Sequence, residues 1–307
     1  MTRDRSGEPT DWVTRAADDA VRHAGEGNRV TCASGISPSG PIHLGNLREF
    51  LTVHFVAEEI RRRGIPVRHL HSWDDYDRFR KVPFGVDESW NTHIGRPLSA
   101  VPDPWECHHS WAEHFKQPLR DALRELGCEM EEISQTAMYT SGAYREQILG
   151  VVGRRDEIDE VLGRYRTKQV ETDDEQEAAA LEDSVALDDE TAGDGLARFP
   201  FKPYCRGCGR DTTTLTSYDD DTTDLAYTCD TCGDSYVTNL ATQDEGKLVW
   251  KIDWPMRWAY ERIDFEPAGA DHSSPGRRSP SATSWWRRSG PGRAPRGSAT
   301  RSWASPA

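Results

Sequence analysis

The stretch "RVTCASGISPSGPIHLGN", residues 29–46, decides the fold class together with "LREFLTVHFVAEEIRRRG", residues 47–64, which follows it. Alternating apolar residues predict a strand over about 29–33, before a loop of glycine, serine and proline. Residues 45–63 place apolar side chains three and four positions apart, as in an amphipathic helix, and Gly64 ends that pattern. A second strand, "IPVRHLHSW", follows at 65–73. A strand–helix–strand unit of this kind is parallel and right-handed, so we predict an α/β fold.

Length, charge and cysteine content limit the classes of protein that fit. The 307 residues suffice for two domains, or for one large core with an inserted module. The net charge is −14, although residues 277–307 hold seven arginines and no acidic residue. The acidic part of the chain before residue 277 repels RNA, so any contact with RNA must be confined to local basic patches. We see no signal peptide and no apolar run long enough for a membrane helix, and seven cysteines favour thiols or metal over disulfides. We expect a cytoplasmic protein.

The loop after the first strand is suited to binding phosphate groups. Small residues at a helix N-terminus let backbone N–H groups approach a nucleotide closely. His43 and Asn46, near the helix start, could donate hydrogen bonds to a phosphate oxygen as charge develops on it. The residues of this loop that fit are Gly35, Ser37, Ser39, Gly40 and Gly45. The alternative is an ordinary turn with a surface histidine.

The sequence "DDYD", residues 74–77, stands where the second strand should end. Ligands of open α/β sheets bind at the carboxyl ends of the strands. Asp74 and Asp75 could therefore hold ammonium groups of a substrate. The alternative is a solvated acidic turn.

Two Cys-x-x-Cys pairs predict a structural zinc site. Cys205 and Cys208 form one pair, Cys229 and Cys232 the other, with twenty residues between the inner cysteines. Four thiolates at this spacing can close a tetrahedral site and leave no open position for catalysis. Unligated thiols or a redox pair are the alternative, which would leave residues 199–240 without a core.

A second, mixed zinc set is a further hypothesis. Asp103, Cys107, His108 and His114 offer a carboxylate, a thiol and two imidazoles at the start of a helix that we expect over 110–126. His109 competes with His108 for the same role. Such residues also meet by chance near helix starts.

The remaining segments differ in composition. Residues 167–197 are acidic and poorly apolar, and favour an exposed linker or insertion. The last thirty residues hold arginine, serine, proline, glycine and tryptophan without periodicity, and read as disordered.

Several motifs resemble one known family. "PSGPIHLGN", residues 38–46, resembles the HIGH signature of class I aminoacyl-tRNA synthetases. The wider loop resembles, more narrowly, the class I lysyl-tRNA synthetases. Agreement extends to "HSWDDYDRFRKVP" at 71–83, "GRPLSAVPDPWECHHSWAEHF" at 95–115, the double Cys-x-x-Cys and "WKIDWPMRWAYE" at 250–261. The resemblance covers about residues 12–276.

This resemblance implies a Rossmann-like parallel sheet and ATP-dependent activation of lysine to lysyl-adenylate, followed by transfer to tRNA(Lys). It implies Mg2+ with the substrate ATP, Zn2+ at the cysteines and in the mixed set, and a monomer. His43 and Asn46 match the positions that stabilise the α-phosphate and the leaving pyrophosphate. The ATP-binding residues implied are Pro38, Ser39, Gly40, His43, Gly45 and Asn46. The lysine-binding residues implied are Gly35, Ser37, Asp74, Asp75, Trp254 and His272, whereas Trp258 is assigned to the core.

The chain departs from the family pattern near its end. Ala270 stands where the family has lysine before Asp271 and His272, and no lysine follows Lys251. The lysine-rich second signature loop and the helical anticodon domain are therefore missing from these residues. We interpret the chain as a C-terminally truncated or frame-altered copy, and expect weak or absent lysylation by it.

Two rival functions stay open. One is a synthetase paralogue that activates an amino acid for an acceptor other than tRNA. The dependence of adenylate consumption on the acceptor would distinguish it. The other is a non-catalytic RNA-binding protein built on the zinc module, which would not bind ATP.

The domains that we expect are the N-terminal part of the catalytic domain (1–170), an acidic linker (171–198), a zinc-ribbon-like module (199–240), a return to the catalytic domain (241–276) and the tail (277–307).

Overall fold

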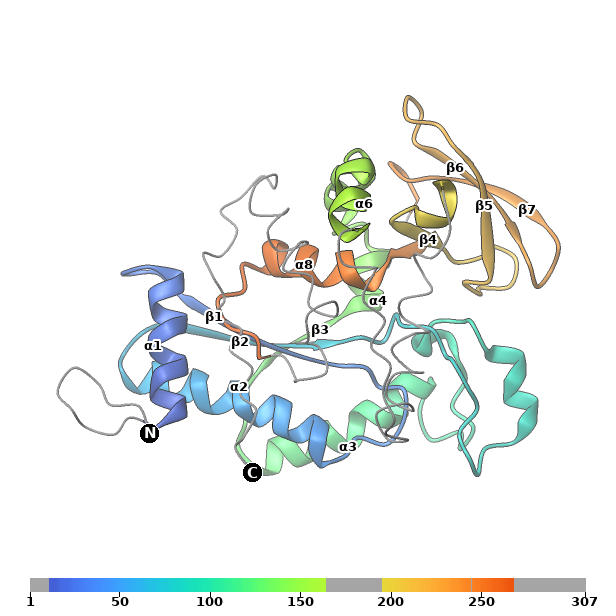
Figure 1. The fold of residues 1–307 in the computed structure, drawn as a ribbon. Coiled ribbons are helices and arrows are strands. Elements are labelled where there is room, and N and C mark those ends of the chain that lie inside the picture. Colours follow the sequence, from blue (N-terminus) through green and yellow to red (C-terminus); the bar gives the residue numbers. More distant parts are fainter. Residues whose placement is uncertain (1–10, 164–194, 244, 268–307) are drawn as a thin grey trace, which may run out of the picture.

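A computed structural model describes residues 11–163, 195–243 and 245–267 of the chain (Figure 1). Within these ranges a three-stranded parallel sheet forms the centre, in the order β1 (Val30–Ile36), β2 (Val67–Trp73) and β3 (Glu131–Ser134). Residues 264–265 extend it beyond β1, since Phe265 bridges Cys32 in parallel. The prediction of an α/β fold with a parallel sheet is confirmed. β1 is longer than predicted, so Gly35 belongs to the strand and not to the loop.

Helices cover both faces of this sheet. α2 (Leu44–Arg62) and α3 (Trp111–Glu125) pack on one face, and α1 (Trp12–Ala24) lies against α2. α8 (Trp250–Glu261) lies on the opposite face (Figure 1). α2 buries Phe50, Val53, Val56 and Ile60 at helical spacing, and Gly64, with φ of +76°, turns the chain out of the helix. Both faces of β1 and β2 are covered, which is why these strands are almost continuously buried.

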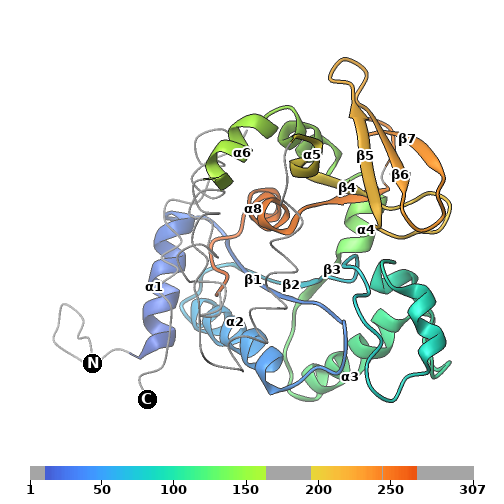
Figure 2. The same cartoon turned by 45° about the vertical axis from the view of Figure 1, so that its right-hand side comes forward.

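A second layer of short elements connects the sheet to a small β module. The elements are the helices α4 (Gln135–Thr140), α5 (Arg145–Val152) and α6 (Arg155–Gly163), the 3-10 turns η1 (Glu88–His93), η2 (Leu98–Ala100) and η4 (Gly195–Arg198), and the antiparallel pair β4 (Phe201–Pro203) and β8 (Gly246–Leu248). The module itself is the antiparallel sheet of β5 (Thr213–Tyr218), β6 (Asp224–Cys229) and β7 (Ser235–Asn239). Figure 2 shows it as a separate lobe at the end of the molecule away from α1.

Several predictions concern residues outside the described part of the chain. The acidic linker falls mostly on residues 164–194, and the tail, Asp271 and His272 on residues 268–307. Among the described helices, none combines the length and the apolar character that crossing a membrane requires.

Candidate active site and metal centres

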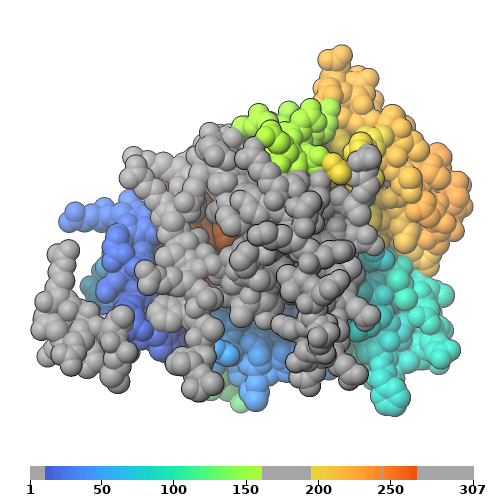
Figure 3. Space-filling model, in the orientation of Figure 1, coloured from blue at the N-terminus to red at the C-terminus, as the bar shows by residue number. Residues whose placement is uncertain are grey.

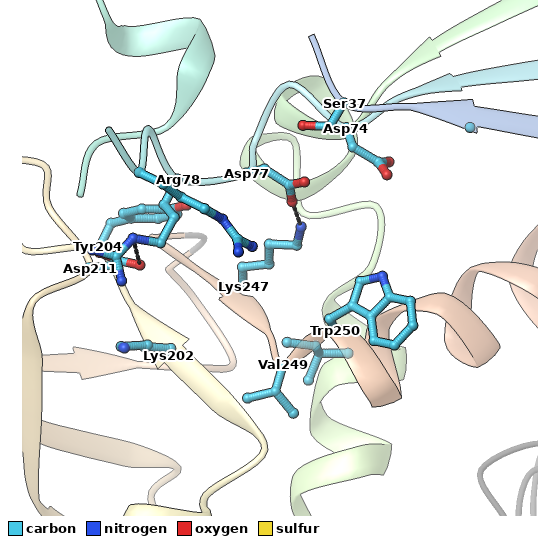
Figure 4. A pocket seen from close by; sticks show the side chains of 13 residues that line it. Ser37, Asp74, Asp77, Arg78, Lys202, Tyr204, Asp211, Lys247, Val249 and Trp250 are labelled. Carbon is cyan, nitrogen blue, oxygen red and sulfur yellow. Dashed lines mark hydrogen bonds and ion pairs between the residues drawn. The ribbon is translucent and has the colours of Figure 1, made fainter. Parts of the chain in front are cut away.

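A cavity of about 260 Å³ opens at the carboxyl ends of β1 and β2 (Figure 4). This is the edge at which α/β sheets bind ligands. Its walls come from the ends of these strands, from the loop after β2, and from β4, β8 and the start of α8. The lining residues are Gly35, Ser37, Asp74, Asp77, Arg78, Arg80, Lys202, Tyr204, Asp211, Lys247, Leu248, Val249 and Trp250. Gly35, Ser37 and Asp74 were predicted as lysine-binding residues, and the structure brings these three together.

Two half-buried carboxyl groups lie next to Gly35. The Gly35 N–H is 3.4 Å from Oε1 of Glu49, and a Cβ at Gly35 would come 3.9 Å from Oε1 of Glu266. Burial, with the nearby Glu266 carboxylate, raises the pKa of Glu49 to about 8. Burial likewise raises the pKa of Glu266, whose Oε2 accepts a hydrogen bond from the Trp258 indole. Neither carboxylate forms an ion pair among the described residues, although the nearby Arg257 guanidinium acts against the rise in the pKa of Glu266.

The two aspartates predicted after β2 have different surroundings. Asp74 lines the cavity and pairs with Arg257, whose Nη1 is 2.6 Å from Oδ1. Asp75 is buried away from the cavity lining, and its Oδ2 accepts hydrogen bonds from Lys116 Nζ and Ser134 Oγ, both at 2.6 Å. The carboxylate of Asp75 therefore holds β3 and α3 to the loop, and the structure does not bring it to the cavity.

Cationic side chains form the wall that faces the β module. Lys247 pairs with Asp77, and Nε of Arg78 is 3.4 Å from Oδ2 of Asp211 (Figure 4). Asp77 and its neighbour Asp253 raise the pKa of Lys247 despite its burial. Arg80 and Lys202 line the same wall and make no ion pair within the described residues. The three aspartates of the lining, Asp74, Asp77 and Asp211, are thus each paired with a cation, and Arg80 and Lys202 add positive charge to this wall.

The phosphate-binding loop that we predicted is divided: Gly35 and Ser37 line the cavity, whereas the residues at the start of α2 do not. His43 is the N-cap of α2: its Nδ1 accepts a hydrogen bond from the Gly45 N–H at 3.1 Å, and its N–H donates to Asn46 Oδ1 at 3.2 Å. A Cβ on Gly45 would lie 2.8 Å from Cε1 of His43, so any other residue here would displace the imidazole from its capping position. The imidazole is exposed beside the helix N-terminus, where an anion is favoured.

The rest of this loop is fixed by α3. The Ser39 carbonyl accepts a hydrogen bond from the Trp111 indole at 3.1 Å. Pro38 is buried, while Ser39 is exposed and Gly40 has open space where a Cβ would be. Backbone near Ser39 and Gly40 is therefore accessible to a ligand.

The tryptophans of α8 form a stack. Trp254 lies between Trp250 and Trp258, with ring centroids 5.5 and 4.9 Å away. Trp250, not Trp254, lines the cavity. Trp258 packs on the core of β1 and β2, as assigned from the sequence.

The sulfur atoms of the four cysteines lie close together, all within 4.8 Å of one another. The sulfur of Cys205 is 3.7 Å from that of Cys232, and the sulfur of Cys208 is 3.6 Å from that of Cys229. Tetrahedral zinc with bonds of about 2.3 Å would set its sulfurs about 3.8 Å apart, so the set fits zinc. Burial acts to raise the pKa of Cys229, but the N–H groups of Cys232 and Thr231 outweigh it and lower that pKa to about 6. A thiolate is thereby favoured, as metal binding requires.

The mixed set also comes together. The candidate ligand atoms of Asp103, Cys107, His108 and His114 all lie within 4.8 Å of one another. Asp103 Oδ2 is 3.3 Å from His114 Nδ1, and Cys107 Sγ is 3.1 Å from His108 Nδ1. His109, the competitor of His108, is exposed and not part of the group. Carboxylate, thiolate and imidazole are all zinc ligands, so this donor set fits zinc as well.

We did not predict most of the lining residues, nor Glu49, which lies beside Gly35 of the lining. Helix α2 carries Glu49 on the stripe of Val53, Val56 and Ile60, at spacings of four, three and four residues. An acidic residue on the buried stripe of a helix was the signal that could have revealed it, because burying a carboxyl group without a partner is costly. Glu266, Arg257 and Lys247 had no such signal.

Comparison with known proteins gives a consistent picture. Residues 10–288 match the family described as tRNA synthetases class I (K), so the match continues beyond Gly276, where we expected the resemblance to end. The chain is 55% identical over 287 residues to a lysine–tRNA ligase of Streptomyces coelicolor, covering 89% of this chain and 50% of that protein. Lysine–tRNA ligases of Thermococcus kodakarensis and Borreliella burgdorferi are 38% and 36% identical, each over 86% of this chain and 46% of theirs. The chain therefore spans about half the length of these curated relatives.

Proposed function

The chain belongs to the class I lysyl-tRNA synthetase family, and from that premise we propose that its cavity binds lysine for ATP-dependent activation and transfer to tRNA(Lys). The observation that carries the proposal is the pair of half-buried carboxyl groups, Glu49 and Glu266, beside Gly35 of the cavity lining. Lysine has two ammonium groups, and a half-buried carboxylate without an ion pair is a suitable partner for one.

We assign lysine binding to Gly35, Ser37 and Asp74 of the cavity lining, and we add Glu49, which lies beside Gly35. Asp74 pairs with Arg257, which Asp253 shares, so Glu49 and Glu266 are the carboxyl groups that have no ion pair among the described residues. An entering ammonium would replace the proton that burial keeps on Glu49. Trp254 approaches Glu266, in keeping with its predicted place beside the lysine pocket.

ATP, with Mg2+, is proposed to lie over the loop before α2. The exposed imidazole of His43 and the amide of Asn46 would donate to the α-phosphate as pyrophosphate leaves, and the helix N-terminus favours the same charge. Pro38, Ser39, Gly40 and Gly45 would bring backbone close to the nucleotide. Zinc at the four cysteines would fold the β module, and zinc at the mixed set would fix the start of α3.

Binding is the direct test, because the chain spans only about half of its relatives. Calorimetry should show that lysine binds and that norleucine, which lacks the side-chain ammonium, does not. Glu49→Gln should weaken lysine binding by about 2–5 kcal/mol, the cost of removing one partner of a buried charge pair. Glu58→Gln is the matched control, since Glu58 lies on the same helix but is half exposed and pairs with Arg61.

The pH dependence sharpens this test. Because Glu49 has a pKa of about 8, it must lose its proton to pair with an ammonium, and lysine affinity should rise about tenfold per pH unit up to pH 8. In Glu49→Gln that rise should become shallower, because only Glu266, whose pKa is also raised, still titrates. A lysine affinity that is equal in both proteins at every pH would refute the assignment.

ATP binding separates the rival functions. A non-catalytic RNA-binding module should bind no ATP, whereas a paralogue with another acceptor should bind ATP and an amino acid. We expect the 307-residue polypeptide to bind ATP and lysine, which separates it from an RNA-binding module, and lysine-dependent ATP–pyrophosphate exchange measures its activity.

A further inference from the structure

The β module contacts the loop after β2 through its first cysteine turn. The Asp211 N–H donates to the Gly95 carbonyl at 2.8 Å, and Arg96 Nε donates to the Cys208 carbonyl at 3.0 Å. Arg210 donates to the Thr92 carbonyl. Figure 3 shows the lobe of the module and the segment around residues 80–100 adjoining at one edge of the molecule. The turn that carries two of the cysteines is thus attached to residues 92–96.

Residues 92–96 are in turn attached to the cavity wall. Phe79 N–H donates to the Arg96 carbonyl at 2.7 Å, and Gly95 N–H donates to the Phe79 carbonyl at 2.9 Å. The backbones of Arg78 and Pro97 also form an isolated antiparallel β-bridge. Phe79 lies between Arg78 and Arg80, two residues of the cavity lining, so a shift at Gly95 must move that wall.

Asp211 occupies the junction of these contacts. Its side chain is buried, and Oδ2 forms the ion pair with Arg78 in the cavity wall. Gly95 has φ of +90°, and a Cβ there would lie 3.1 Å from Asp211 Oδ1, so glycine permits the close approach. One residue therefore touches both the loop and the wall, from a position three residues after Cys208.

We propose that Asp211 is a positioning residue, which couples the four-cysteine module to the cavity wall through Gly95 and Arg78. The state of the cysteine site then sets the placement of Arg78 and of the ligand groups beside it. The coupling itself concerns only contacts within the chain. Its effect on lysine binding rests on the proposed function.

The test compares Asp211→Ala with Asp220→Ala. Asp220 belongs to the same module and also pairs with an arginine outside it, Arg155, at 2.7 Å, but it does not touch the loop. Hydrogen exchange is followed at the amides of Phe79 and Gly95, with Val56 in α2 as reference. Asp211→Ala should speed exchange at Phe79 and Gly95 about tenfold, the scale of a modest coupling between sites. Asp220→Ala should leave it unchanged, and both should keep the zinc content of the parent.

Removing zinc from the parent with a chelator should accelerate the same two amides and spare Val56. Should Asp211→Ala fail to fold, Arg96→Ala removes the second link and should give the same acceleration. Unchanged exchange at Phe79 and Gly95 in the folded variants, or after zinc removal, would overturn the proposal.

Lysine binding to the same variants keeps the two proposals apart. Asp211→Ala should bind lysine about tenfold more weakly than Asp220→Ala. A parent that binds no lysine would defeat the proposed function, while the exchange data would still decide the coupling. A parent and an Asp211→Ala variant with equal lysine affinity would overturn the consequence for the site.

Discussion

Lys116 and Asp75 form an ion pair in the interior of the protein, with Nζ 2.6 Å from Oδ2 and 3% and 2% of the two side chains exposed. Lys116 of α3 is thereby tied to the loop after β2. Ser134 Oγ and the Thr136 N–H donate to the same carboxylate, so its charge is fully compensated by hydrogen bonds. This network explains why one of two adjacent aspartates serves the framework while Asp74 faces the cavity.

Breaking this pair should cost stability. Lys116→Met leaves Asp75 buried without its cation, and we expect a loss of about 3–5 kcal/mol in the free energy of unfolding. Urea denaturation followed by circular dichroism measures it. Arg124→Ala is the control, because Arg124 and Asp121 form an exposed pair that should contribute less than about 1 kcal/mol. Equal losses in the two variants would contradict the assignment of Asp75 to the framework.

The zinc content of variants should show whether the mixed set of Asp103, Cys107, His108 and His114 binds a metal ion and whether His109 takes part. We expect about two equivalents of zinc per chain, one for each donor set. His114→Ala should lower the content by about one equivalent, and Cys208→Ser should remove the other. Elemental analysis of His109→Ala supplies the control, since His109 is exposed and outside the group. Retention of all zinc by His114→Ala would mean that the mixed set is not a metal site.

Buried histidines should make the fold sensitive to acid. Burial lowers the pKa of His69 to about 4 and that of His71 to about 3. Both are neutral in the folded and unfolded states above pH 6.5. Below that value the unfolded chain takes up protons that the folded chain refuses, so each costs about 2 kcal/mol of stability between pH 7 and pH 5.

The measurement for His69 is a difference between proteins, because Glu49, protonated when folded, contributes in the opposite direction over this pH range. The loss of stability between pH 7 and pH 5 should be about 2 kcal/mol smaller in His69→Leu than in the parent. His109→Leu, at an exposed position, should match the parent. A parallel pH profile for His69→Leu and the parent would show that His69 titrates normally in the fold.

The N-cap of α2 should depend on glycine at position 45. In Gly45→Ala the new methyl group would meet the His43 ring at 2.8 Å, so the ring must leave its capping position. We expect ATP to bind about tenfold more weakly, because the placement of His43 and of the first turn changes. Gly150→Ala, in α5 with open space around it, should bind ATP like the parent. Unaltered ATP affinity in Gly45→Ala would separate His43 from the nucleotide site.

Local patterns were sufficient for several parts of this molecule. The strand–helix–strand unit follows from the periodicity of residues 29–73, since each element must bury one stripe or face. The cysteine spacing was sufficient to predict a four-sulfur cluster, because a short module without a core needs such a link. His43 and Asn46 could be placed at the start of a helix for the same reason: capping involves neighbours in the chain.

The composition of the cavity and of the carboxyl groups beside it depends on tertiary structure. Glu49, Glu266 and Asp74 come from a helix, a segment beyond α8 and a strand end, and only the parallel sheet brings them to one edge. The different roles of Asp74 and Asp75 depend on Arg257 and Lys116, which lie far away in sequence. The sequence by itself determined the elements and the donor sets, since these depend on short-range spacing. Which carboxylates are neutralised and which are left for a ligand depended on long-range packing, because burial and distant partners set the cost of a charge.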